Sequence, residues 1–281
     1  MSFRLFDIKR FAINDGPGIR TTIFMKGCPL HCAWCHNPEG ISSEPQMMFT
    51  SKKCIGCKTC IGLTDEEAAE ACPTLARQIA GKQWTMDELM TVIEKERKVM
   101  EDSDHGGVTI CGGEPLLHYA DTIEILRELG KRGFHRCVDT SLFAPQHVVD
   151  EVASECELML IDIKHMDSSI HSKYTGVPNE TILSNIKHLA DKGTSFWIRV
   201  PLIEGINADE QNIGQTAVFI ASLPTKPLRI ELLPYHDIGK GKHERLGTIY
   251  NPTNIPMATP SESTRQRCIE QFAKYGIKAI I

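Results

Sequence analysis

The sequence lacks any long apolar run: no segment of the 281 residues reaches the roughly 18 consecutive apolar positions that a membrane-spanning helix requires. The first twenty residues alternate polar and apolar positions and lack the apolar stretch of a secretion signal. Basic residues are not in excess either, since Lys and Arg total 31 against 36 for Asp and Glu, a formal net charge of −5. Nucleic-acid binding usually needs a basic surface. We therefore expect a cytoplasmic protein that binds neither membranes nor nucleic acid.

Cysteine, by contrast, is plentiful, with 11 residues. Disulfides are rare in the cytoplasm, so metal ligands and buried thiols are expected. Cys28, Cys32 and Cys35 form a C-x3-C-x2-C run directly after an apolar segment. Iron–sulfur clusters normally take four cysteine ligands, so a triplet with no obvious fourth cysteine nearby predicts a cluster with one iron open to another molecule. A three-ligand zinc site with bound water is the alternative.

A second cysteine group lies in residues 45–80, where Cys54, Cys57 and Cys60 follow each other at C-x2-C spacing and Cys72 precedes a proline. This pattern is typical of a ferredoxin-type cluster loop. It occurs once, so the segment predicts ligands for one accessory cluster with four irons. A zinc ribbon is the alternative, although it usually has two C-x2-C pairs. We expect the remaining cysteines to be buried apolar residues: Cys111, Cys137, Cys156 and Cys268. Cys111 directly precedes a Gly-Gly-Glu sequence, so it could instead lie near the mouth of the barrel.

Strand-like and helix-like segments alternate from residue 81 onward, and a capping box at Thr85 and Glu88 starts the first helix. The predicted strands are residues 20–26, 107–111, 134–138, 158–161, 196–200, 228–233 and a short last strand at 278–281. The first six make βα units, which predicts a parallel α/β sheet with right-handed crossovers. An open partial barrel and a doubly wound sheet are both compatible with this order. We assign residues 1–44 and 81–281 to this unit and residues 45–80 to an insertion.

Polar or unusual residues recur just past the carboxyl ends of these strands. The carboxyl ends of parallel strands meet at one edge, where the active sites of such folds lie. Each residue alone is a weak signal, because a Gly-Gly pair is more often a turn. Together with the cysteine triplet they predict one shared site. These residues are Gly112, Gly113, Glu114, Asp139, Asp162, Lys164, Arg199 and His236.

The triplet and the Gly112–Pro115 sequence GGEP together look like the radical S-adenosylmethionine (SAM) enzymes. Within these, the phrases at 15–20, 162–164 and 233–236 are similar to the glycyl-radical-enzyme activating enzymes, such as the pyruvate formate-lyase activases. The resemblance runs from about residue 5 to the end of the chain, interrupted by the insertion. It implies a partial (β/α)6 barrel, similar to a TIM barrel, with a ferredoxin-like insertion. That insertion usually carries two clusters in the family, whereas this one has ligands for one.

The resemblance implies an anaerobic enzyme. Cys28, Cys32 and Cys35 would hold a four-iron cluster whose fourth iron chelates SAM. One electron, from flavodoxin or ferredoxin, would then cleave SAM to methionine and a 5′-deoxyadenosyl radical, which abstracts hydrogen from a glycine of a glycyl-radical enzyme. The alternatives are a radical SAM enzyme that modifies a small molecule or peptide, and a non-catalytic iron–sulfur electron-transfer protein.

The resemblance further implies roles for individual residues. The Trp34-Cys35-His36 segment packs the adenine, the Gly112-Gly-Glu114 edge meets the methionine amino group, and the Asp162-Ile163-Lys164 segment binds the ribose and the SAM carboxylate. The remaining assignments are a nucleoside contact for His236, a SAM contact for Arg199 and a monovalent cation beside SAM for Asp139.

Several of these roles have a plainer alternative. His236 could be a satisfied core or surface residue, and Asp162 with Lys164 could be a solvated surface pair. Trp34 could wedge its loop against the core, and Glu114 could bond within its own loop. Arg199 could form an ion pair inside the barrel, and Asp139 could cap a helix. The segment Gly239–His243 predicts a mobile, solvated loop, with a partner-docking surface as the second interpretation.

Overall fold

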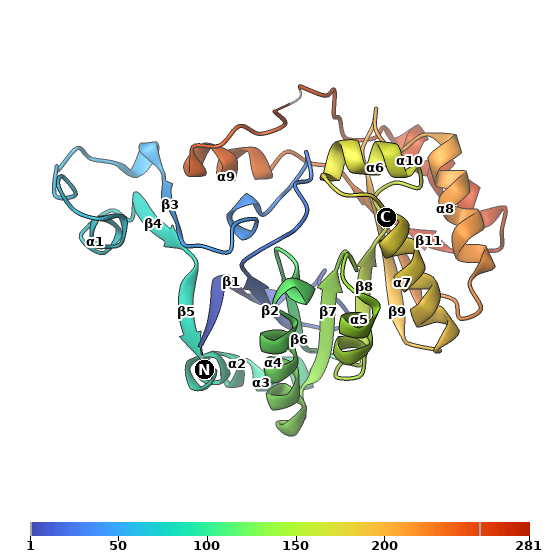
Figure 1. The fold of residues 1–281 in the computed structure, drawn as a ribbon, viewed down its shortest axis with the longest axis horizontal. Helices are drawn as coiled ribbons and strands as arrows, with labels where there is room; N and C mark the ends of the chain where they lie inside the picture. Colours follow the sequence, from blue (N-terminus) through green and yellow to red (C-terminus); the bar gives the residue numbers. More distant parts are fainter. Residues whose placement is uncertain (1, 253) are drawn as a thin grey trace.

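The computed structural model describes residues 2–252 and 254–281, and an open sheet organises them (Figure 1). Within these residues the strand order is β11-β10-β9-β8-β7-β6-β2-β1-β5. The strands are β1 (Ser2–Ala12), β2 (Arg20–Met25), β5 (Lys82–Thr85), β6 (Gly107–Gly112), β7 (His135–Thr140), β8 (Leu158–Asp162), β9 (Phe196–Leu202), β10 (Arg229–Pro234) and β11 (Ala279–Ile280).

Neighbouring strands from β2 to β11 run parallel, whereas β1 is antiparallel to both β2 and β5. The two edge strands, β5 and β11, do not pair with each other in the described part of the chain, so the sheet does not close. This confirms the predicted α/β fold and its open partial barrel. The strands β1 and β5 were not predicted, and they extend the sheet by an antiparallel pair at one edge.

Helices follow the parallel strands as predicted and cover the outer face of the sheet (Figure 1). These helices are α2 (Met86–Glu94), α3 (Arg97–Glu101), α4 (Tyr119–Lys131), α5 (Gln146–Ala153), α7 (Glu180–Asp191), α8 (Glu210–Ser222) and α10 (Glu262–Ala273). The capping box of α2 is confirmed: the backbone N–H of Thr85 donates to the Glu88 carboxylate (2.8 Å), and the Glu88 N–H donates to the Thr85 hydroxyl (3.3 Å).

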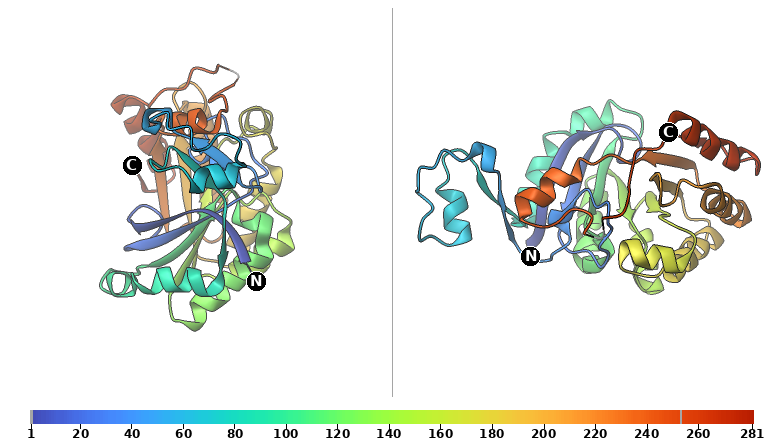
Figure 2. Two further views of the ribbon diagram at one scale, coloured as in Figure 1. Left: turned by 90° about the vertical axis from the view of Figure 1, so that its left-hand side faces the viewer. Right: turned by 90° about the horizontal axis from the view of Figure 1, so that it is seen from above.

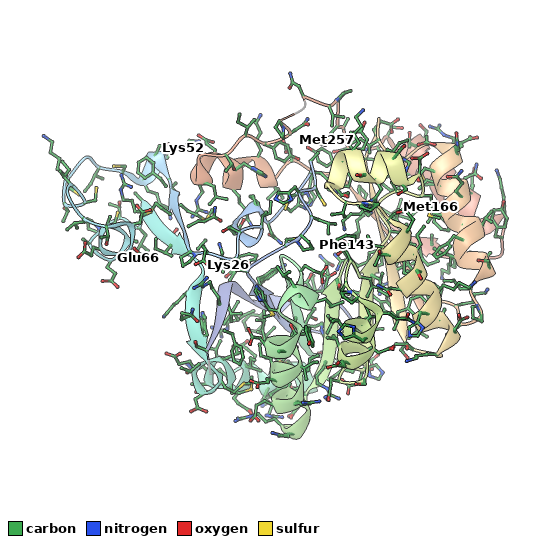
Figure 3. The ribbon with its side chains drawn as sticks, in the orientation of Figure 1. Lys26, Lys52, Glu66, Phe143, Met166 and Met257 are labelled. Atoms are coloured by element: carbon green, nitrogen blue, oxygen red, sulfur yellow. The ribbon has the colours of Figure 1, made fainter. Side chains whose placement is uncertain are left out.

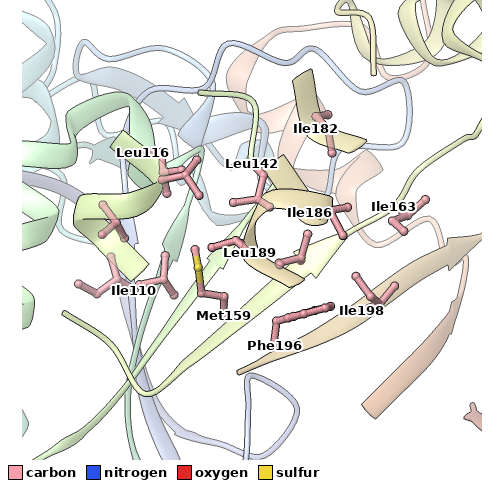
Figure 4. Packing of buried hydrophobic residues seen from close by; sticks show 14 of the residues in the cluster. Ile110, Leu116, Leu142, Met159, Ile163, Ile182, Ile186, Leu189, Phe196 and Ile198 are labelled. Carbon is pink, nitrogen blue, oxygen red and sulfur yellow. The ribbon is translucent and has the colours of Figure 1, made fainter. Parts of the chain in front are cut away.

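The main core lies between these helices and the sheet (Figure 4). Met159 of β8 and Phe196 of β9 are completely or almost completely buried there, together with Leu189 of α7. Residues 158–161 of β8 are all buried, as expected for a strand covered on both faces. This packing holds the strands in place through one face of the sheet. The carboxyl ends of the strands remain available to line a site.

Residues 45–80 form a separate small unit that projects away from the main sheet (Figure 2). Two antiparallel strands, β3 (Gln46–Phe49) and β4 (Arg77–Ala80), make its base. Between them the chain runs through an exposed segment and the short helix α1 (Asp65–Glu70), which starts with a capping box at Thr64. We call residues 45–80 the insert and residues 50–64 the insert loop.

Lys26 connects the insert to the barrel. Its side chain is buried, and its ammonium group donates to the carbonyls of Glu39 (2.8 Å) and Ala80 (3.4 Å) and to the side chain of Gln46 (3.3 Å). These three acceptors belong to the segment after the cysteine triplet and to the two strands of the insert. Burial lowers the pKa of Lys26 to about 8. One side chain therefore ties the insert to the segment that carries the triplet.

The segment predicted as a mobile loop, Gly239–His243, instead lies in a helix, α9 (Gly239–Leu246). Gly239 is buried, and a Cβ atom there would lie 2.5 Å from the Cys35 carbonyl oxygen. Lys242 donates to the Asn37 side chain (2.8 Å). The prediction was wrong because glycine and lysine are common in loops, whereas here glycine permits close packing and lysine binds the triplet segment.

Candidate active site

A cavity of about 610 Å³ lies at the carboxyl ends of the parallel strands. It brings together residues from segments that are far apart in the sequence. Of the predicted site residues, those that line it are Cys28, Cys32, Trp34, Cys35, His36, Gly112, Gly113, Glu114, Asp139, Asp162, Lys164, Arg199 and His236. Ile163 does not line it, because its side chain is buried in the main core.

The cysteine triplet lies on a loop, residues 26–41, that we call the triplet loop. The backbone N–H of Cys28 donates to the Ile41 carbonyl (2.9 Å), which closes the base of the loop. At its outer edge, the N–H of His31 donates to the Thr175 carbonyl (2.7 Å) at the end of α6 (Ser168–Thr175). The loop is thus held on two sides, and the backbone fixes where the three thiols face.

All three thiols of the triplet have raised pKa values. Burial raises the pKa of Cys28 and Cys32, and it raises the pKa of Cys35 to about 12. The protein alone therefore keeps these groups as neutral thiols at neutral pH, and a bound metal must supply the positive charge that favours thiolates. Thiolates are the ligands that iron–sulfur clusters take.

The donor set at the triplet fits a cluster. Among the described residues, no three His, Cys, Asp or Glu side chains lie close enough together to hold a single metal ion. A four-iron cluster bonds each cysteine through a different iron, so its ligands surround a group of atoms rather than a point. Cys28, Cys32 and Cys35 line one cavity and are within electrostatic reach of one another.

Gly112 and Gly113 let the end of β6 pass directly under the triplet loop. Gly112 has a φ of +131°, and a Cβ atom on Gly113 would lie 2.2 Å from the Gly27 carbonyl oxygen and 2.4 Å from that of Gly40. The close approach that the structure shows is to the protein backbone of the triplet loop, and the predicted contact of this edge with SAM stays a prediction. Any larger residue at Gly113 would displace that loop.

Glu114 is buried, and its carboxylate is held by β6 and β7 segments. It accepts hydrogen bonds from the Thr140 hydroxyl (2.6 Å), the Ser141 backbone N–H (2.8 Å) and the Leu116 backbone N–H (3.1 Å). The plainer alternative for Glu114, a hydrogen bond within its own loop, is present at Leu116, and further bonds reach the end of the neighbouring strand. The residue fixes two strand ends at the wall of the cavity.

Four charged side chains and one thiol form a row along the cavity. Lys164 donates to Asp162 (2.6 Å), Asp162 lies 4.0 Å from Arg199, and Arg199 donates to Asp139 (2.8 Å). The Cys111 thiol also donates to Asp139 (3.1 Å). Cys111, which was expected to be a buried apolar residue or to lie near the site, lines the cavity from the penultimate position of β6. The ion pair that was the alternative for Arg199 is present.

The charges in this row keep their ionised forms despite burial. Burial alone would lower the pKa of Lys164, but the Asp162 carboxylate raises it above its usual value. Burial raises the pKa of Asp139 to about 6, and the Arg199 guanidinium opposes this. The Nε of Arg199 is buried and has no hydrogen-bond partner among the described residues. The row therefore carries two positive and two negative charges, and the Arg199 Nε is a buried donor without a hydrogen bond to the described part of the chain.

Aromatic side chains form another part of the wall. Trp34 is buried against Ile203, Ile206 and Tyr235, so it wedges the triplet loop as its plainer alternative predicted. The rings of His36 and His236 stack with centroids 4.2 Å apart, and burial, assisted by the His236 ring, lowers the pKa of His36. This stacked pair of rings forms a flat surface against which a heteroaromatic base can pack.

Comparisons with known proteins identify the family. The model of the Radical SAM superfamily matches residues 22–217. The trans-4-hydroxy-L-proline dehydratase activating enzyme of Clostridioides difficile is 35% identical over 280 residues, covering 92% of each chain. The (2S)-3-sulfopropanediol dehydratase activating enzyme of Klebsiella oxytoca is also 35% identical, over 99% of this chain and 96% of that relative. The chain belongs to the glycyl-radical-enzyme activating enzymes of the radical SAM superfamily.

A solved structure agrees with this assignment. A domain of pyruvate-formate lyase-activating enzyme from Bacteroides vulgatus ATCC 8482 is 50% identical, with a TM-score of 0.54 over 62% of this chain and 98% of that one. This activating enzyme therefore uses SAM and a four-iron cluster to generate a radical on a partner enzyme. The family resemblance predicted from the sequence is confirmed. No helix among the described residues is long and apolar enough to span a membrane.

The cysteines of the insert lie in an environment opposite to that of the triplet. Cys54 and Cys57 are exposed, while Cys60 and Cys72 are partly exposed. The Thr59 hydroxyl donates to the Cys57 sulfur (3.1 Å) and lowers its pKa, and the Arg77 backbone N–H lowers that of Cys72. Hydrogen bonds to Cys57 and Cys72 thus shift these two groups toward the thiolate form, whereas burial shifts the triplet toward the neutral thiol.

Several cavity residues of the activating enzyme were not predicted. Asn14 and Asp15 come from the segment before β2, while Arg229 and Glu231 lie within β10 and pair at 2.9 Å. Apart from Arg199, which lies inside β9, the prediction considered residues at or past the strand ends, whereas alternate positions inside a strand face the same side. Arg229 and Glu231 are charged residues at alternate positions of an otherwise apolar strand, and this pattern could have revealed them.

Proposed function

We propose that the activating enzyme cleaves SAM in this cavity and that the resulting radical abstracts hydrogen from a glycine of a glycyl-radical enzyme. The observation that carries the proposal is the triplet loop held over a row of buried charges at the carboxyl ends of the parallel strands. The names of the relatives, which include two dehydratase activating enzymes, support a protein substrate of this kind.

Cys28, Cys32 and Cys35 would hold a four-iron cluster. When bound, this cluster supplies the electron that cleaves SAM to methionine and a 5′-deoxyadenosyl radical. The protein binds and orients the nucleotide and keeps water away from it. Lys164 would pair with the SAM carboxylate, and Asp162 would accept hydrogen bonds from the ribose.

Other cavity residues would position the rest of SAM. Trp34, His36 and His236 would pack the nucleoside, and the Gly112–Glu114 edge would border the amino group. Arg199 lines the cavity, so it would contact SAM and hold the row of charges in place through its ion pair with Asp139. We also propose a monovalent cation beside Asp139, which would have to compete with the Arg199 ion pair.

The insert would hold one accessory four-iron cluster through Cys54, Cys57, Cys60 and Cys72. Electrons would come from flavodoxin or ferredoxin, and the enzyme would work in the cytoplasm under anaerobic conditions. The cytoplasm is reducing, which would keep these cysteines available as metal ligands.

The test uses anaerobically reconstituted protein reduced with dithionite in the presence of SAM. We expect 5′-deoxyadenosine and methionine in equal amounts, and neither from the Cys32→Ala variant. With a co-expressed glycyl-radical enzyme, an electron paramagnetic resonance signal centred on glycine should appear. Cleavage that continues in Cys32→Ala would contradict the proposal, and cleavage without any glycine radical would favour a small-molecule or peptide substrate.

A further inference from the structure

The insert loop is a concentrated patch of positive charge on an acidic protein. Residues 50–64 contain Lys52, Lys53 and Lys58 and no Asp or Glu, while the whole chain has a net charge of −5. The three lysines are exposed, and their side chains make no hydrogen bond or ion pair with any described residue. The acids of the insert are grouped on α1 instead: Asp65, Glu66, Glu67 and Glu70. Figure 3 shows Lys52 and Glu66 on opposite sides of the insert.

Apolar side chains lie among these lysines. Ile55 is 70% exposed and Ile61 is 72% exposed, and both lie next to a cysteine of the predicted accessory cluster. Apolar residues surrounded by charged ones are typical of a protein–protein contact surface. We call Lys52, Lys53, Lys58, Ile55 and Ile61 the lysine face.

Hydrogen bonds hold the base of the insert, and with it the lysine face, in place relative to the catalytic part of the molecule. Arg245 of α9 donates to Gln78 in β4 of the insert (3.0 Å), and Lys242 of the same helix donates to Asn37 in the triplet loop (2.8 Å). Lys26 joins the same two parts through buried hydrogen bonds. A fixed position between the two cysteine groups is what stepwise electron transfer between them would require.

We propose that the lysine face docks an acidic electron-carrier protein that reduces the accessory cluster. The proposal rests on the proposed function, since it assumes that clusters occupy both cysteine groups. In each event the carrier's reduced flavin or iron–sulfur centre loses one electron, and the SAM-cleaving centre gains it. An acidic carrier is attracted by the three lysines and repelled by the acidic residues of α1, so its encounters with the insert are oriented.

A glycyl-radical enzyme is the competing occupant. Its glycine must reach the cavity at the strand ends, whereas the insert projects away from the main sheet (Figure 2). Cys54 and Cys57 are exposed and directly adjoin Lys53 and Lys58 in the sequence, so a carrier bound at these lysines would lie next to two of the proposed cluster ligands. The structure therefore favours the electron carrier.

The kinetic test compares two variants of equal charge. Lys52→Glu, Lys53→Glu and Lys58→Glu together reverse the lysine face, and Lys98→Glu, Lys187→Glu and Lys274→Glu make the same change at exposed sites on α3, α7 and α10. With photoreduced flavodoxin as the carrier, we expect 5′-deoxyadenosine formation to fall about tenfold or more in the first variant and less than about twofold in the second. With dithionite, both should match the wild type.

A binding test does not depend on turnover. Carbodiimide joins lysines to carboxylates in contact, so oxidised flavodoxin should cross-link to peptides carrying Lys52, Lys53 or Lys58 in the wild-type enzyme. The cross-links should weaken as salt rises from about 50 to about 300 mM, because ions screen exposed charges. Cross-links at other lysines only would overturn the proposal.

Other outcomes separate this proposal from the proposed function. Equal rates with flavodoxin in all three proteins would overturn the docking site alone. Normal SAM cleavage with flavodoxin but lost glycine-radical formation would assign the face to the glycyl-radical enzyme, which also overturns it. Wild-type enzyme that fails to cleave SAM with dithionite would instead overturn the proposed function.

Discussion

The two cysteine groups of this activating enzyme differ in burial and in the direction of their pKa shifts. The triplet lies in a cavity where burial raises the pKa of each thiol, whereas the insert exposes Cys57 and lowers its pKa through hydrogen bonds from Thr59. A buried group of ligands with one position open can exclude water from a reactive species. An exposed group can exchange electrons with another protein. The difference teaches that ligand spacing predicts a cluster, while the environment indicates its task.

The largest expected effect is on SAM cleavage, which should depend on the triplet and not on the cysteines of the insert. Cys32→Ala should lower dithionite-driven SAM cleavage at least about 1,000-fold, since the cofactor supplies the chemistry. Cys57→Ala should reduce the iron content from about eight to about four per chain and leave this activity within about threefold. Product analysis and iron assays measure both. A similar loss of cleavage in the two variants would remove the distinction.

The next effect concerns the thiols of the metal-free enzyme. At pH 7.5, iodoacetamide should modify Cys54 and Cys57 about tenfold or more faster than Cys28 and Cys35, because alkylation needs an accessible thiolate. Mass spectrometry of timed digests gives the rates. Urea-unfolded enzyme is the control, in which the rates should converge. Uniform rates in the folded enzyme would show that the burial of the triplet does not control its reactivity.

A smaller effect compares the same substitution in both regions. Glu114→Ala leaves buried donors of Thr140 and Ser141 without a partner and should lower the free energy of unfolding by about 2–4 kcal/mol. Glu66→Ala on the exposed face of α1 should change it by less than about 0.5 kcal/mol. Denaturant titrations measure both. Equal effects would mean that Glu114 does not hold the two strand ends together.

The smallest effect is the loss of stability as the pH falls from 7.5 to 5.5. It should arise in the barrel, because the insert contains no histidine. His171 of α6 is buried, and burial lowers its pKa below the usual 6.5. Above that value the histidine is neutral in both states, so its contribution is complete. As the pH falls below 6.5, the unfolded chain binds a proton that the folded chain resists, so stability decreases.

Unfolding free energies at pH 7.5 and 5.5 measure this slope. His171→Gln should reduce the loss on acidification by about 1 kcal/mol or less. An unchanged slope would mean that His171 titrates alike in both states.

The sequence was sufficient to predict the parallel part of the sheet, since its apolar strands and the capping box at Thr85 are local signals. It was also sufficient to predict most of the cavity, because parallel strands bring their carboxyl ends together whatever their separation along the chain. It missed β1 and β5, whose pairing depends on distant residues. It also misread α9, whose glycine and lysine act through contacts with the triplet loop. Such contacts leave no pattern in the segment itself.

The most direct test is electron–nuclear double resonance on the reduced Cys57→Ala variant, which retains only the triplet's cluster, with SAM labelled at the methionine nitrogen and carboxylate. Magnetic coupling from both labels to iron is expected in this variant and none in Cys32→Ala. A zinc ion at the triplet, or reduced iron there that shows no coupling to either label, would contradict an open iron that binds SAM.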